Sequence, residues 1–145
     1  MKRLITLLAL LFSTSAFATN WQMIVDSSGG TRLLVEVDSV AIDSYTKADK
    51  SNGTRVYATM EFLSENEIVF TAVIDAEDCL VREAGPLLNV YTDKASNIFF
   101  WSMKGGKMYD AQGQWLCGYL QGTLENYKKQ NKQNKQGTKS NKNYM

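Results

Sequence analysis

The sequence predicts an α+β domain: an antiparallel sheet of about six strands, followed by one C-terminal helix. Two observations support this class. In residues 21–103, short segments alternate apolar and polar side chains between clusters of turn residues, which is typical of strands. Beyond residue 110 the period changes, because a leucine recurs every fourth residue, which places these side chains on one face of a helix. The leucines are Leu116, Leu120 and Leu124.

The first four expected strands lie between residues 21 and 75. Residues 21–25 and 31–38 flank a run of Asp, Ser and Gly and are expected to form a β-hairpin with a longer loop. Residues 39–53 are polar and are expected to form an exposed loop. Residues 54–62 alternate again, whereas residues 68–75 are mostly apolar on both faces, which favours a central strand.

Two more strands are expected before the helix. Residues 81–91 contain Gly85 and Pro86, and proline lacks the N–H that an inner strand donates. We therefore expect a bent or edge strand there, with residues 87–91 as its better half. Residues 98–103 form the last expected strand.

Asp110 is the expected N-cap of the helix. Three glycines, at 113, 118 and 122, would each cost about 1 kcal/mol relative to alanine, so the helix should be stable only when docked on the sheet. We expect Gly118 to allow a close approach between the helix and a strand.

Residues 1–18 have the three zones of a cleavable signal peptide. Lys2 and Arg3 precede an apolar stretch that ends in the pattern Ala16-Phe17-Ala18. About a dozen residues are strongly apolar, whereas a membrane span needs roughly 20. An N-terminal anchor and a buried helix are the alternatives. No cysteine lies near the cleavage point for lipid attachment. We therefore expect an exported protein without a stable membrane anchor, periplasmic or secreted, with association with the cell surface left open.

The chain contains two cysteines, Cys79 and Cys117, and no histidine. In an oxidising compartment two cysteines most simply form one disulfide, which would tie the helix to the sheet. Two free thiols or an intermolecular bridge are the alternatives. A zinc site would be short of ligands. The sequence therefore predicts neither a metal nor a cofactor.

The charge is distributed unevenly along the chain. Residues 19–122 carry 8 Lys/Arg and 14 Asp/Glu, a net charge of −6, whereas residues 123–145 carry six Lys and one Glu. We expect a single domain over 19–127 and a disordered tail over 128–145, because the tail is almost free of apolar residues. The tail either is simply solvated or binds an anionic polymer or acidic partner. Its lysines are Lys128, Lys129, Lys132, Lys135, Lys139 and Lys142.

No catalytic motif is apparent. The absence of histidine excludes Ser-His-Asp and Cys-His systems. Asp75, Glu77 and Asp78 cluster before Cys79, and their simplest interpretation is a solvated turn. A loose calcium site and a carboxylate-based hydrolase are the alternatives. The chain is therefore expected not to be an enzyme.

The aromatic residues allow two interpretations. Core packing is the simpler one for the three tryptophans, since aromatic side chains supply much of the core of a small domain. A surface stripe that binds a ligand is the sharper one. The tryptophans are Trp21, Trp101 and Trp115, and the stripe would be Tyr57, Tyr91 and Trp101.

The order of landmarks over residues 21–120 resembles the bacterial surface-adhesin protein E family. This resemblance implies an antiparallel sheet with a C-terminal helix tied by a disulfide. It also implies a non-enzymatic role in binding host matrix and plasma proteins, with a homodimer as one option. Those adhesins are lipid-anchored, and this chain lacks the lipidated cysteine, which favours a periplasmic or released form. The landmarks are Trp21, Val37-Asp38-Ser39-Val40, Asp78-Cys79 and Cys117.

Together these observations predict a non-catalytic, adhesin-like binding protein of the envelope. Its partner is expected to be a protein or an anionic polymer rather than a nucleic acid. The alternative is a periplasmic inhibitor or immunity-type protein that blocks an enzyme such as a lysozyme, because an acidic body suits a basic target.

Overall fold

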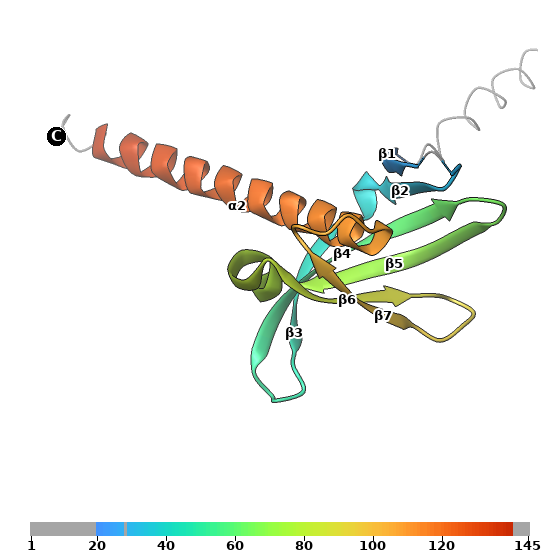
Figure 1. Cartoon of the computed structure of the whole chain (residues 1–145). Helices are drawn as coiled ribbons and strands as arrows, with labels where there is room; N and C mark the ends of the chain where they lie inside the picture. The colour runs from blue at the N-terminus through green and yellow to red at the C-terminus, as the bar shows by residue number, and fades with distance from the viewer. Residues whose placement is uncertain (1–19, 28, 141–145) are drawn as a thin grey trace, which may run out of the picture.

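The computed structural model describes residues 20–27 and 29–140 (Figure 1). The expected signal peptide, residues 1–18, lies outside the described residues. The chain forms an antiparallel sheet followed by one long helix, so the α+β class is confirmed. No helix in the described part of the chain is both long enough and apolar enough to cross a membrane.

The sheet has seven strands in the order β1-β2-β4-β5-β6-β7, and β3 pairs with β4. All pairings are antiparallel. Two short helical turns, η1 and η2, interrupt the strands, and helix α2 follows them. The elements are β1 (Trp21–Asp26), β2 (Arg32–Glu36), η1 (Val37–Ser39), β3 (Ala41–Thr46), β4 (Asn52–Leu63), β5 (Glu67–Asp75), η2 (Asp78–Arg82), β6 (Ala84–Val90), β7 (Asn97–Ser102) and α2 (Met108–Ser140).

Strand β3 corrects the prediction that residues 39–53 form a loop. The strands β2 and β3 pair with successive parts of β4, and η1 separates them. At this break the hydroxyl of Ser39 accepts the N–H of Thr59 at 2.8 Å and donates to the carbonyl of Glu36 at 2.7 Å. The Ser39 side chain thus takes the place of a backbone partner where η1 interrupts the pairing, which keeps β3 aligned on β4.

Residues 81–91 were predicted to form a bent or edge strand, and the edge alternative is wrong, because β6 has a neighbouring strand on each side. Its second half, Leu87 to Val90, pairs with β5 on one side, and β7 lies on the other side. The first half pairs only with β7, and Pro86 lies there. Proline is tolerated at this position because no β5 residue is paired to it. The better half of the strand was therefore predicted correctly, but the edge is β7.

Helix α2 covers one face of the sheet and buries the core there (Figure 1). Trp101 is 0% exposed, which confirms core packing for this tryptophan, whereas Trp21 and Trp115 are only partly buried. Gly113 lies over Trp101, because a Cβ at position 113 would be 2.3 Å from a carbon of the indole ring. Gly118 is exposed and faces open space, so the expected close approach occurs at Gly113 instead.

The predicted disulfide is present. Cys79 in η2 and Cys117 in α2 are bonded, with a Cα–Cα distance of 5.4 Å, and both are buried. The bridge ties η2 to the covered face of the sheet through α2.

Helix α2 begins at Met108, so Asp110 lies in the first turn and is not the N-cap residue. The carboxylate of Asp110 is buried and accepts the N–H groups of Lys107 and Ser102, both at 2.9 Å. Gln114 donates to the carbonyls of Ser102 at 3.0 Å and Gly105 at 2.8 Å. These contacts fix the connection from β7 to α2.

Helix α2 continues to Ser140, where a disordered tail was expected from residue 128. Lysine and glutamine are good helix formers, and the docked residues 108–124 supply the nucleus from which the helix extends. Every residue from 125 to 135 is exposed. We call residues 125–140 the basic arm. In Figure 1 it projects beyond the sheet.

Candidate functional site

The face of the sheet opposite α2 is not covered by any described element, and we call it the open face (Figure 1). The strand register places one row of side chains across it, in which Tyr57 pairs with Val73, Val73 with Leu88, and Leu88 with Ile98. Ile98 is 74% exposed and Phe100 is 67% exposed. The open face is therefore apolar toward β7, where burial by a partner would be most favourable.

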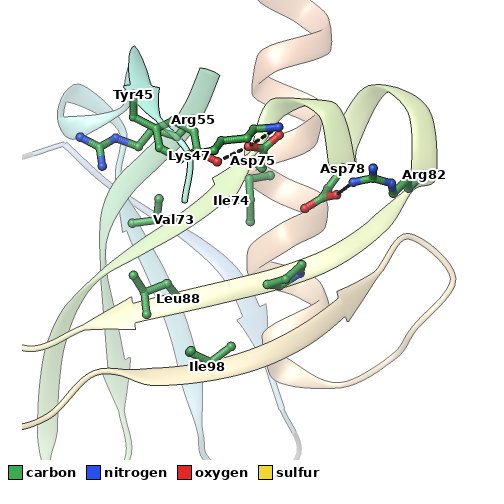
Figure 2. Close-up of a pocket in the computed structure, with 11 residues that line it drawn as sticks. Tyr45, Lys47, Arg55, Val73, Ile74, Asp75, Asp78, Arg82, Leu88 and Ile98 are labelled. Atoms are coloured by element: carbon green, nitrogen blue, oxygen red, sulfur yellow. Dashed lines mark hydrogen bonds and ion pairs between the residues drawn. The ribbon is translucent and has the colours of Figure 1, made fainter. Parts of the chain in front are cut away.

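A groove with a volume of about 470 Å³ lies on the open face (Figure 2). Its apolar floor comes from β5, β6 and β7. Its polar wall comes from the β3–β4 hairpin and from the segment around η2. The floor residues are Val73, Pro86, Leu88 and Ile98, and the wall residues are Tyr45, Lys47, Arg55, Asp75, Asp78 and Arg82.

Asp75, at the end of β5, is the central carboxylate of the wall (Figure 2). It accepts hydrogen bonds from the Tyr45 hydroxyl and from the Glu77 N–H, and Lys47 Nζ lies 3.7 Å from its carboxylate. Burial alone would raise the pKa of Asp75, but these partners outweigh burial and lower it. The same hydrogen bond raises the pKa of Tyr45 to about 12.

The other two carboxylates of the cluster are also paired. Arg82 lies 2.6 Å from Asp78 and 3.5 Å from Glu77, and Lys47 lies 3.0 Å from Glu77. Asp78 is only 6% exposed and packs against Gly85, where an added Cβ would be 2.3 Å from its Oδ2. The network therefore joins the β3–β4 hairpin to η2.

This network corrects the interpretation of Asp75, Glu77 and Asp78 as a solvated turn. Asp75 and Asp78 are largely removed from solvent, and each carboxylate has a cationic partner. In the part of the chain that the structure describes, no group of three His, Cys, Asp or Glu side chains is placed to hold a metal ion. Lys47 and Arg82 already pair with the carboxylates on which the calcium-site alternative depended.

Arg55 closes the other end of the wall. Its Nε lies 2.7 Å from Asp43 Oδ1, and this hydrogen bond lowers the pKa of Asp43. The guanidinium carbon is 5.5 Å from the centre of the Tyr45 ring and 5.8 Å from that of Tyr57. Such stacking orients both aromatic rings at the surface.

The predicted aromatic stripe of Tyr57, Tyr91 and Trp101 does not exist. Tyr57 lies on the open face, but Trp101 is fully buried on the covered face. The Tyr91 ring packs 5.9 Å from that of Phe70, a core residue. The sequence could not show which face of β7 is covered, because both faces of this strand carry large apolar side chains.

Strand β7 has no strand partner on its outer side among the described residues. The N–H of Ser102 points outward to Asp110, whereas the N–H of Met103 bonds inward to Glu83. Because these groups alternate along a strand, those of Phe100 and Ile98 also point outward. The strand contains neither a charged residue nor a proline, which are the usual protections of an edge.

Among the lysines predicted to form a binding site, none whose side chain the structure describes lines the groove. Lys128, Lys129, Lys132 and Lys135 are exposed along the basic arm, and Lys139 lies further along the same helix. Lys142 lies outside the described residues. Sequence reasoning missed the groove, although the apolar side chains of Ile98 and Phe100 on the second face of β7 were a usable signal.

Comparison with protein families, with characterised proteins and with solved structures finds no match to this chain.

Proposed function

We propose that this chain is a non-catalytic, exported binding protein of the bacterial envelope that holds a partner protein at the open face. The observation that carries the proposal is the unprotected edge of β7, with Ile98 and Phe100 largely exposed beside the groove. A partner that covered these two side chains would remove apolar surface from water, and this burial favours association.

The edge and the groove together suit an extended segment of a partner protein. Outward N–H groups at Ile98 and Phe100 can bond to the backbone of an added strand. Every second side chain of such a strand would lie on the open face beside Ile98 and Phe100, and a long apolar side chain could lean over β7 toward Leu88 on the groove floor. The edge would supply affinity, and the groove would select apolar side chains.

The polar wall supports binding over catalysis. A general acid needs a raised pKa, whereas the pKa of Asp75 is lowered. Asp78 and Glu77 are held by Arg82, and Lys47 is shared between Glu77 and Asp75. These carboxylates stabilise the groove wall, and no pair of them is left to attack a substrate from two sides.

An adhesin-like role is the version of this proposal that agrees with the resemblance to the surface-adhesin protein E family. The second candidate is an inhibitor of a basic enzyme such as a lysozyme. Residues 19–122 carry a net charge of −6, and this charge would steer a basic protein toward the domain.

The test compares the variant Ile98→Ser/Phe100→Ser with Met23→Ser. Met23 is 49% exposed on β1, at the opposite end of the sheet, and serves as the matched control. We expect the double variant to bind purified extracellular-matrix proteins at least about tenfold more weakly, with an unchanged melting temperature. Equal binding by the double variant, or no binding of matrix proteins by the unaltered chain, would contradict the adhesin version. Stoichiometric inhibition of a lysozyme would favour the second candidate.

A further inference from the structure

The lysines of the basic arm form a stripe along one face of α2. Lys128, Lys132 and Lys135 are separated by four and then three residues, and Lys139 continues the spacing. In a helix with 3.6 residues per turn, this spacing keeps Lys128, Lys132 and Lys135 on one side. Successive members are about 4.5 to 6 Å apart along the axis. The stripe is therefore a linear array of positive charges.

This array is not part of the domain core. Among the side chains that the structure describes, Leu124 is the last one of α2 that packs against the core cluster. Over residues 125–140 the arm holds five lysines and one acidic residue, Glu125. The arm therefore presents a strongly positive surface on a helix whose side chains, from 125 to 135, are all exposed.

We propose that the lysine stripe of the basic arm is a docking site for a linear anionic polysaccharide. The argument is charge complementarity: a polymer with negative groups along its length can follow the stripe and pair with several lysines at once. This proposal goes beyond the partner at the open face, because the arm extends a helix that lies on the covered face.

Two other occupants fit the arm less well. A membrane-surface helix buries an apolar face in the lipid, and residues 128–140 contain no apolar face. A coiled coil with a second copy needs apolar side chains at the positions with this four-and-three spacing. Here those positions are lysines, so two copies would repel each other along the seam.

The residues between the lysines favour a polysaccharide over a nucleic acid. Gln130, Asn131 and Gln133 carry amides, which both donate and accept hydrogen bonds and so match sugar hydroxyls. Residues 128–140 contain no arginine and no aromatic residue. Base stacking and base-edge contacts, on which selective nucleic-acid binding depends, therefore have no partner here.

The experiment measures binding of the full secreted chain to a heparin oligosaccharide at several salt concentrations. The measurement compares three proteins: the unaltered chain, the stripe variant Lys128→Gln/Lys132→Gln/Lys135→Gln, and a relocation variant. The relocation variant combines Lys132→Gln and Lys135→Gln with Gln130→Lys and Gln133→Lys. It keeps the net charge but moves two lysines to the other side of the helix. The melting temperature of each variant checks that the domain is unchanged.

We expect the unaltered chain to bind, with an affinity that falls as salt rises. The stripe variant should bind on the order of a hundredfold more weakly, at roughly fivefold per lysine. The relocation variant should lose most of the affinity as well. No binding at low salt would overturn the proposal, and so would a relocation variant that binds as well as the unaltered chain. Tighter binding to a DNA duplex or to phosphatidylglycerol vesicles would overturn the choice of polysaccharide. Binding of matrix proteins at the open face should be unchanged in the stripe variant, so the two proposals can fail separately.

Discussion

At the scale of single residues, the hydrogen bond from Tyr45 to Asp75 connects the two halves of the groove wall. The substitution Tyr45→Phe removes this bond but keeps the ring. We expect the pKa of Asp75 to rise, and the free energy of unfolding at pH 7 to fall by about 1 kcal/mol at this solvent-screened site. Because the folded-state pKa of Asp75 is lowered, its contribution is complete above the unfolded pKa near 3.8 and is lost as the pH falls below it.

The loss caused by Tyr45→Phe should therefore shrink as the pH falls below about 4. Urea denaturation across this range, with NMR titration of the Asp75 carboxyl carbon, measures both effects. Tyr57→Phe is the control, because the Tyr57 hydroxyl donates to Asp43, at 3.3 Å, and its loss should leave the pKa of Asp75 unchanged. The converse experiment removes the acceptor: Asp75→Asn should return the pKa of Tyr45 from about 12 toward 10. An unchanged Asp75 titration in Tyr45→Phe would show that the bond does not form in solution.

At the scale of elements, the packing of α2 on β7 depends on the absence of a side chain at Gly113. In Gly113→Ala, the new Cβ would lie 2.3 Å from a carbon of the Trp101 ring. The gain in helix propensity, about 1 kcal/mol, should be outweighed by overpacking of about 1–3 kcal/mol. Gly118→Ala is the matched control, because nothing lies within 4 Å of its Cβ. We expect chemical denaturation to show destabilisation for the first variant and stabilisation for the second. Stabilisation by both would mean that the helix lies further from β7.

Apolar or alternating segments between turn residues were enough to predict β1, β2, β4, β5 and β7, but these signals failed for β3 and for the basic arm. Strand β3 was missed because its side chains on the open face, Asp43 and Tyr45, are polar and pair with Arg55 and Asp75. The basic arm was expected to be disordered because its composition is polar and charged. Composition alone cannot show that a helix which starts in a docked segment continues into these residues. Local signals cannot predict partners supplied by distant strands.

The candidate site was largely hidden from the sequence for the same reason. The groove needs the β3–β4 hairpin and η2 to meet at the end of β5, and Lys47 and Glu77 are separated by 30 residues. A strand with apolar side chains on both faces normally indicates a buried position. Here one face of β7 carries Trp101 in the core and the other carries the exposed Phe100. Only the placement of α2 decides which face is covered.

At the scale of the whole molecule, the disulfide joins helix α2 to η2, the turn between strands β5 and β6. It links Cys79 and Cys117, which are 38 positions apart, and so reduces the conformational entropy of the unfolded chain. The variant Cys79→Ala/Cys117→Ala should lose about 4 kcal/mol of unfolding free energy. A small domain has only about 5–15 kcal/mol in total. The bridge also fixes η2, which supplies Asp78 and Arg82 to the groove wall.

Removal of the bridge should therefore weaken the groove wall before the sheet unfolds. Urea denaturation of the oxidised, reduced and double-alanine chains measures the stability. Hydrogen exchange should show faster opening of η2 than of β4 and β5, which lie at the centre of the sheet. A loss below about 1 kcal/mol would mean that Leu116 and Leu120 dock the helix by packing alone. Equal exchange in η2 with and without the bridge would show that the salt bridges between Lys47, Glu77 and Arg82 hold this turn in place without it.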